Sequence, residues 1–186
     1  MNQESIFVNG IYFTVVLGKN LIDSDADVIA HQTNCLGIMG SGVAVAIKRK
    51  WPKVFREYRL YCHEEEPLGT TQLIKISVSQ YVANVFGQYS IGREQRQTDY
   101  DALKTALQSL KNQMQALNLK FVAFPVYMGA ARGGGSWESI LNMILEVFKF
   151  SGISIELDAY WGADAEDHFL ETVRILADAK SLTEDP

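Results

Sequence analysis

The chain has 186 residues, a length that suits one domain and leaves little room for a second. Hydrophobic residues make up 47% of it and charged residues 21%, so a packed core is expected rather than disorder. The formal net charge of -5 argues against a general binder of DNA or RNA, which needs a basic face. An anionic small ligand remains open, because backbone N–H groups hold phosphate without Lys or Arg.

The two cysteines, Cys35 and Cys62, are too few for a disulfide framework. No CxxC pair and no His/Cys cluster at zinc spacing occurs in the sequence, so we predict no metal site and no cofactor. Residues 1–10 lack the basic-then-apolar pattern of a secretion signal, and no apolar run approaches the roughly 18 residues that a membrane span needs. These features predict a soluble, cytoplasmic protein without a membrane partner.

In chain order, the first half of the sequence begins with a hairpin, since the Asn9-Gly10 pair is typical of a tight turn. A third strand follows and ends in polar residues, and Trp51-Pro52 then separates two helical patterns. The elements predicted here are strands at residues 5–9, 11–17, 27–31, 71–78 and 80–86, and helices at residues 43–50 and 53–62.

The second half contains the clearest helix, in which Leu103, Leu107 and Leu110 recur at helical spacing. A glycine-rich loop follows the next strand, and Ser136 can cap the helix after that loop. We expect a single domain over residues 1–180, with an extra C-terminal helix. The elements predicted here are helices at residues 98–117, 136–148 and 163–179, strands at residues 120–126 and 153–157, loops at residues 87–97 and 127–135, and a flexible tail at residues 181–186.

Strands that alternate with helices after an initial hairpin predict an α/β fold, with a mixed, mainly parallel sheet and helices on both faces. In such sheets ligands bind outside the carboxyl ends of the strands. Both glycine-rich segments follow strand ends, so both can line one crevice.

The first glycine-rich segment leads from Asn34 through Gly37, Gly40 and Gly42 into a helix. Glycines let the backbone approach a ligand, and a helix N-terminus offers free N–H groups to a phosphate. A plain strand-to-helix connection is the alternative, because the segment is neither a Walker loop nor a clean GxGxxG. The side-chain amide of Asn34 can hydrogen-bond a sugar hydroxyl at the crevice.

The second glycine-rich segment, residues 129–135, places three consecutive glycines before a helix. Such a run is costly unless the backbone needs unusual angles, and a flexible surface turn is the alternative. Arg132 can pair with a phosphate or lie solvated on the surface.

His31 ends a predicted buried strand and is a candidate general base, because the pKa of imidazole lies near neutrality. A structural histidine with satisfied hydrogen bonds is the alternative. Cys35 requires a nearby histidine and some exposure to act as a nucleophile, and otherwise fills space in the core. The Tyr160-Trp161 pair after the last strand either stacks on a base or covers the core.

A resemblance to the macro domain family is carried by residues 28–52, which read VIAHQTNCLGIMGSGVAVAIKRKWP, and it continues at residues 81–88 and 124–137. The similarity is to the branch with ADP-ribose-phosphate phosphatases and terminal ADP-ribose glycohydrolases. It implies a three-layer α/β/α sandwich that binds ADP-ribose or a close derivative, free or on an ADP-ribosylated macromolecule. It also implies these ligand contacts: Asn34 at the distal ribose, Gly40, Ser41 and Gly42 along the ribose and diphosphate, and Gly129, Ala130, Ala131, Arg132 and Gly133 over the diphosphate.

The chain departs from the family where adenine is recognised. The family has Gly-Asp at the end of the early strand, and the Asp accepts a hydrogen bond from the adenine amino group. Here Gly18 is followed by Lys19, which cannot accept it. The candidate replacement is Asn20, or an acidic residue elsewhere such as Asp27.

A second departure concerns catalysis. The catalytic lysine of the glycohydrolase branch falls near Gln88, which cannot form a Schiff base or act as a cationic acid. The loop carboxylate of the family falls near Gly133 or Ser136, neither of which is acidic. We therefore do not expect the lysine-dependent mechanism.

Two functions remain open. One is a hydrolase that removes a phosphate or an ester-linked group at the distal ribose, with His31 or a bound water. The other is a non-catalytic domain that reads or sequesters an ADP-ribose-type nucleotide. The missing Lys and Asp favour the binder, and the retained His31–Asn34 segment favours the enzyme.

Overall fold

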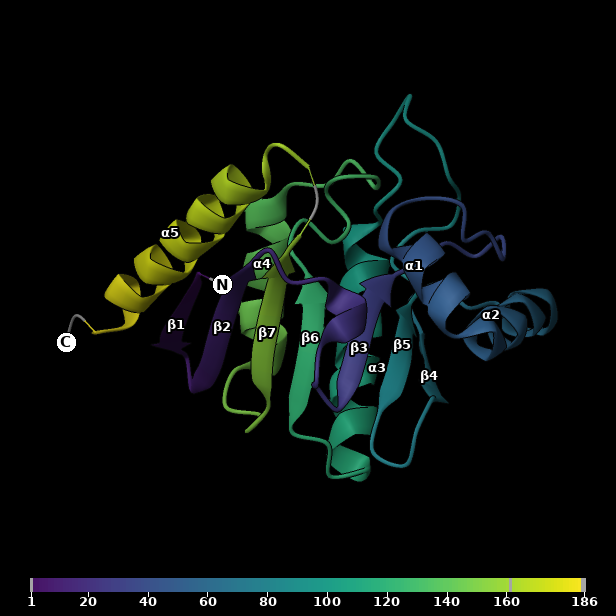
Figure 1. The fold of residues 1–186 in the computed structure, drawn as a ribbon, viewed down its shortest axis with the longest axis horizontal. Helices are drawn as coiled ribbons and strands as arrows, with labels where there is room; N and C mark the ends of the chain where they lie inside the picture. Colours follow the sequence, from purple (N-terminus) through teal and green to yellow (C-terminus); the bar gives the residue numbers. More distant parts are fainter. Residues whose placement is uncertain (1, 161, 185–186) are drawn as a thin grey trace.

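The computed structural model describes residues 2–160 and 162–184, so the predicted aromatic Trp161 lies outside the described residues. Within them the chain forms one seven-stranded sheet with the order β1-β2-β7-β6-β3-β5-β4 (Figure 1). The five central strands are parallel to one another, and only the β1–β2 and β4–β5 pairs are antiparallel. The strands are β1 (Gln3–Val8), β2 (Ile11–Leu17), β3 (Val28–Gln32), β4 (Thr71–Lys75), β5 (Tyr81–Val85), β6 (Phe121–Pro125) and β7 (Ser154–Ala159).

Helices cover both faces of this sheet, which makes three layers. One face packs against α3, α4 and α5, and the other packs against α1, α2 and the short 3-10 helix η1. The predicted mixed sheet with helices on both faces is confirmed. The helices are η1 (Leu21–Asp23), α1 (Gly42–Lys50), α2 (Pro52–Glu64), α3 (Tyr100–Ala116), α4 (Trp137–Phe148) and α5 (Ala165–Glu184).

Local sequence explains why these elements form where they do. In α3 the apolar residues at helical spacing are all buried, and the Asp99 carboxylate accepts a hydrogen bond from the Ala102 N–H at 3.0 Å. Ser136 caps α4 in the same way through the Ser139 N–H at 3.3 Å. Within the described residues, no helix is long and apolar enough to cross a membrane.

The C-terminal helix differs from its predicted extent. It continues to Glu184, so residues 181–184 are helical and not part of a loose tail. No Gly or Pro interrupts the sequence before Pro186, and the Ser181 hydroxyl donates to the Ala177 carbonyl one turn earlier at 3.1 Å. The helix therefore has no local reason to stop at Ala179.

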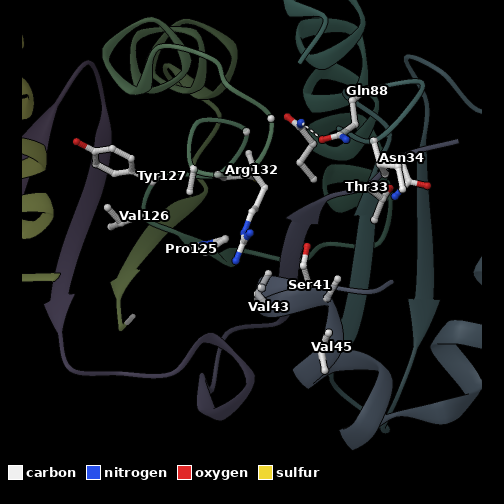
Figure 2. Close-up of a pocket in the computed structure, with 18 of the residues that line it drawn as sticks. Thr33, Asn34, Ser41, Val43, Val45, Gln88, Pro125, Val126, Tyr127 and Arg132 are labelled. Carbon is white, nitrogen blue, oxygen red and sulfur yellow. Dashed lines mark hydrogen bonds between the residues drawn. The ribbon is translucent and has the colours of Figure 1, made fainter. Parts of the chain in front are cut away.

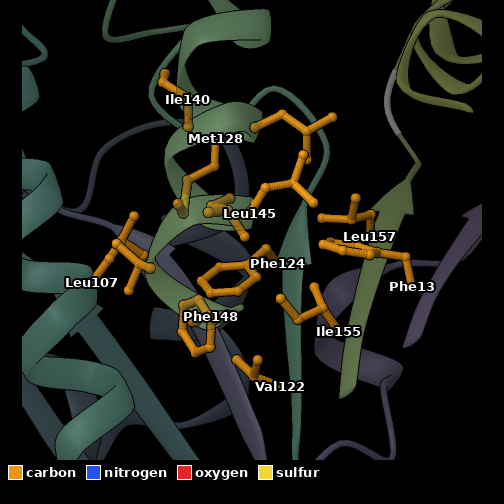
Figure 3. Packing of buried hydrophobic residues seen from close by; sticks show 14 of the residues in the cluster. Phe13, Leu107, Val122, Phe124, Met128, Ile140, Leu145, Phe148, Ile155 and Leu157 are labelled. Atoms are coloured by element: carbon orange, nitrogen blue, oxygen red, sulfur yellow. The ribbon is translucent and has the colours of Figure 1, made fainter. Parts of the chain in front are cut away.

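The larger core lies between the sheet and the α3–α4–α5 layer, and Phe124 of β6 is at its centre (Figure 3). Phe124 is fully buried and packs edge-on against Phe148 of α4, with ring centroids 6.1 Å apart. This packing fixes the position of β6, and so of the glycine-rich loop that follows it.

We expect Phe124→Ala to lower the free energy of unfolding by about 3–5 kcal/mol, because it leaves a cavity in the core. Phe150→Ala is the matched control, since the Phe150 side chain is 79% exposed, and it should cost within about 0.5 kcal/mol. Urea unfolding followed by circular dichroism measures both. Equal losses in the two variants would contradict this account of the core.

Candidate functional site

A cleft of about 930 Å³ opens at the carboxyl ends of the central parallel strands. It is lined by the ends of β3, β6 and β7, the first turn of α1, and the loops that follow β5 and β6 (Figure 2). The predicted residues that line it are Asn34, Gly40, Ser41, Gly42, Gln88, Gly129, Ala131, Arg132 and Gly133. The fold thus brings the two glycine-rich segments together at one site.

Because of the order of strands in the sheet, the two ends of the cleft are lined by different kinds of side chain. At one end lie Tyr127, Asp158 and His168, and at the other end lie Asn34 and Gln88. The adjacent order β7-β6-β3-β5 accounts for this, because each group sits at or after the end of one of these strands. The cleft therefore has an aromatic, carboxyl-bearing end and an amide-bearing end.

Between the two ends lies the N-terminus of α1. Ser41 precedes the helix in an extended conformation and makes no side-chain capping bond, so the N–H groups of the first turn are open to another acceptor. A Cβ placed on Gly42 would meet nothing within 4 Å, which shows free space in front of this turn. Figure 2 shows the Arg132 side chain reaching into the same cleft from the glycine-rich loop. Helix N–H groups and a guanidinium together favour an anion here.

At Gly129 and Gly133 the glycine-rich loop lies too close to its neighbours to carry a side chain. Gly129 has a left-handed φ of 73°, and a Cβ on it would lie 2.5 Å from Gln32 Oε1. A Cβ on Gly133 would overlap Thr98 Oγ1. The glycines are thus required by a close approach, and the flexible-turn alternative does not describe them.

Gln32, at the end of β3, joins several segments that line this side of the cleft. Its Nε2 donates to Gln88 Oε1 at 2.8 Å and to Thr98 Oγ1 at 2.9 Å, and the Thr98 hydroxyl donates to the Gly129 carbonyl at 2.6 Å. The Gln88 amide in turn donates to the Ser90 carbonyl at 2.6 Å. Gln88 therefore helps to join the end of β3 to the loops after β5 and β6.

The Asn34 side chain makes most of its hydrogen bonds within its own loop. Its Oδ1 accepts from the backbone N–H groups of Leu36 at 3.0 Å and Ile38 at 3.3 Å, and from the Tyr58 hydroxyl at 3.0 Å. Its Nδ2 donates to the Ile38 carbonyl at 2.7 Å and has a second N–H bond for a ligand. Asn34 shapes the first glycine-rich loop as well as lining the cleft.

His31 does not lie in the cleft. The alternation of β3 turns it away from the Gln32 side of the sheet, and it is fully buried. Its Nε2–H donates to Asn84 Oδ1 at 2.8 Å, and burial lowers the pKa of its imidazole to about 4. A neutral, buried imidazole outside the cleft has no ligand atom to act on, so its position does not support the expected role as a base.

Three more predicted residues lie away from the cleft surface. The Asn20 side chain caps η1 by accepting from the Ile22 N–H at 3.4 Å, and Ala130 is absent from the lining. Asp27 accepts from the N–H groups of Lys120 at 2.7 Å and Phe121 at 3.0 Å, at the opposite edge of the sheet. Neither Asn20 nor Asp27 is placed to read a base in this cleft.

Cys35 is a buried thiol that donates weakly to the Gln88 carbonyl at 3.4 Å. Burial, and to a smaller degree nearby Cys62, raises its pKa to about 11. A protonated, buried thiol fits the space-filling alternative. Among the described residues, no group of three or more His, Cys, Asp or Glu side chains could hold a metal ion.

The sequence did not single out Tyr127, His168 or Asp158. The Tyr127 ring stacks on His168 with centroids 3.8 Å apart and on Trp137 at 5.6 Å, and its hydroxyl donates to Glu171. Tyr127 also has a left-handed φ of 63°, which is unusual for a residue with a side chain. The one local signal for Asp158 was a second acidic residue, two positions after Glu156, at the end of the last strand.

Comparison with known proteins agrees with this fold and cleft. The macro domain family matches residues 30–144. An ADP-ribose 1''-phosphate phosphatase of Lodderomyces elongisporus is 34% identical over 124 residues, covering 61% of this chain and 71% of that protein. The chain is an α/β protein with its cleft at the strand ends, and it belongs to the macro domain family.

Two further comparisons are more distant. A DNA ADP-ribosyl glycohydrolase of Mycobacterium bovis is 25% identical over 134 residues, covering 70% of this chain but 37% of that protein, so the chain spans little more than a third of it. The macrodomain of Mycobacterium tuberculosis DarG is 21% identical, with a TM-score of 0.68 over 77% of this chain and 96% of that chain. At this level of identity, the similarity to the DarG macrodomain shows only that the two chains share a fold.

We expect Gly129→Ala to destabilise the domain by about 1–3 kcal/mol more than Gly152→Ala, because only its new methyl group meets Gln32. Gly152 is a matched control, since it has the same left-handed φ of 73° and a Cβ on it would meet nothing within 4 Å. Unfolding free energies from urea titrations check the difference. Equal destabilisation would show that left-handed strain alone explains the glycine at position 129.

Proposed function

We propose that this chain binds ADP-ribose or a close derivative, with the ligand's diphosphate between the N-terminus of α1 and Arg132. The observation that carries the proposal is this pair of groups in the middle of a cleft with chemically different ends. The cleft volume of about 930 Å³ lies at the upper end of the range for small-molecule sites, which suits an extended nucleotide.

The two ends of the cleft support an orientation for the ligand. Amide side chains suit sugar hydroxyls, so the distal ribose lies near Asn34 and Gln88. Aromatic rings suit a base, so the nucleobase lies near Tyr127 and His168. The names of the relatives, which concern ADP-ribose 1''-phosphate and ADP-ribosylated DNA, support the same ligand class. An ADP-ribosylated macromolecule is then the natural larger partner.

Hydrolysis at the distal ribose is the second candidate, and the names of the phosphatase and glycohydrolase relatives favour it. The described residues that line the amide-bearing end argue against it, because His31 is buried elsewhere and Gln88 replaces the family's lysine. An amide has no proton to give or accept near neutral pH. Reading or sequestering the nucleotide is therefore the form of the function that we favour.

We expect ADP-ribose to give a saturable calorimetric titration with the wild-type chain and none at millimolar concentration with Gly42→Glu. A carboxylate there fills the space in front of the α1 N-terminus and repels the diphosphate. Gly152→Glu carries the same charge and backbone strain away from the cleft and should bind normally. Retained affinity in folded Gly42→Glu removes this turn from the site, and no titration with wild type overturns the proposal.

Turnover is checked separately. We expect no phosphate release from ADP-ribose 1''-phosphate above the rate without protein, although the compound should bind. A general base contributes on the order of a hundredfold or more to such a step, and the amide-bearing end supplies none among its described residues. Release by wild type that His31→Ala leaves unchanged would establish a hydrolase that works with a bound water.

A further inference from the structure

Asp158, near the end of β7, is the one acidic residue among the described residues that line the cleft. On β7, Ile155 and Leu157 face the core beneath α4, so Glu156 and Asp158 face the opposite side, where η1 and α1 lie. In the sheet Asp158 lies between Val16 of β2 and Pro125 of β6. Its side chain is 3% exposed, and the residue lines the cleft.

The charged and polar groups around the end of β7 pair with Glu156 and not with Asp158. Lys19 donates to both oxygens of Glu156, at 2.8 and 2.9 Å, and the Ser24 hydroxyl donates to Glu156 Oε1 at 2.6 Å. Glu156 thus accepts three hydrogen bonds and is paired with Lys19, whereas neither oxygen of Asp158 has a hydrogen-bond partner within distance among the described residues. A buried carboxyl with unmade hydrogen bonds is destabilising, and a structural role alone does not account for it.

The surroundings also settle its charge. Burial, followed by the charge and hydrogen-bonding effect of the nearby Glu156 carboxylate, raises the pKa of Asp158 to about 8, against the opposing effect of Lys19. Asp25 is the other acidic group that acts on Lys19, and it is exposed. At neutral pH the carboxyl is therefore mostly protonated, and it has one O–H donor and one carbonyl acceptor to offer.

This donor and acceptor lie at the aromatic end of the cleft, beside Tyr127, His168 and Tyr160. Adenine carries an amino group as donor, and next to it on the same edge a ring nitrogen as acceptor. A protonated carboxyl matches both at once. The two replacements expected from the sequence, Asn20 and Asp27, are used elsewhere in the fold.

We propose that Asp158 is the residue that recognises the nucleobase, with its carboxyl group hydrogen-bonded to the amino edge of adenine. The inference rests on the proposed binding of an ADP-ribose-type nucleotide and adds the group that selects its base. Both carboxyl oxygens are buried, so the proposal requires side chains at this end of the cleft to shift slightly when the base binds.

The test compares two probes, ADP and the diphosphate of purine riboside, which lacks the 6-amino group. Wild type should prefer ADP by about tenfold or more, the worth of one good hydrogen bond to a buried group. Asp158→Asn, whose amide also offers a donor and an acceptor, should keep a preference. Asp158→Leu should bind both probes equally. Asp25→Asn, which removes a carboxylate near Lys19 but outside the cleft lining, should behave as wild type.

The pH dependence gives a second readout. Because the pKa of Asp158 is raised, the protonated form is present below it and is lost as pH rises through about 8. Affinity of wild type for ADP should therefore fall between pH 7 and pH 9, by severalfold, whereas that of Asp158→Asn stays level.

A folded Asp158→Leu variant that still prefers ADP overturns the assignment of Asp158 while leaving nucleotide binding intact. The same conclusion follows if Asp158→Asn keeps the wild-type pH dependence. If wild type binds neither probe nor ADP-ribose, the proposed function fails and the assignment fails with it. Thermal melts of each variant establish that the protein is folded.

Discussion

The shape of the cleft depends on how closely the loop after β6 approaches the side chain of Gln32. Gln32 stands at the end of β3 and donates to both Gln88 and Thr98, so three segments far apart in the sequence meet at one amide. The loop can lie against this group only because residues 129 and 133 have no side chain. Arg132, held within that loop, is thereby directed into the cleft.

The proposed binding of an anionic ligand by an acidic protein depends on local charges in the cleft and not on the net charge. The chain has a net charge of -5, yet the middle of the cleft offers helix N–H groups and a guanidinium. The two carboxyls of β7, Glu156 and Asp158, do not oppose this. Lys19 neutralises Glu156, and burial keeps a proton on Asp158 near neutral pH. These two residues therefore add little negative charge close to the proposed diphosphate position.

Local sequence patterns predicted most of the secondary structure and both glycine-rich loops. Leu103, Leu107 and Leu110 bury as their spacing required, and the two loops lie on one cleft because strand ends of a parallel sheet share an edge. The side of the sheet that His31 faces was harder to predict. Alternation along β3 puts His31 and Gln32 on opposite faces, and only the fold shows that the cleft lies on the Gln32 side. Sequence order alone does not say where the cleft begins along a strand.

The sequence by itself determined the helices and strands and the helix N-terminus that follows the first glycine-rich segment. It also showed that Lys19, and not an acidic residue, follows Gly18. These features depend only on short stretches of chain. Only the tertiary structure decided what each polar side chain meets. Asn20 and Asp27 bond to nearby backbone, whereas Asp158 becomes buried and unpartnered because Lys19 and Ser24, more than a hundred residues away, are taken by Glu156. Burial and partners are properties of packed neighbours, and those neighbours come from β2, β6 and β7, which only the folded sheet brings together.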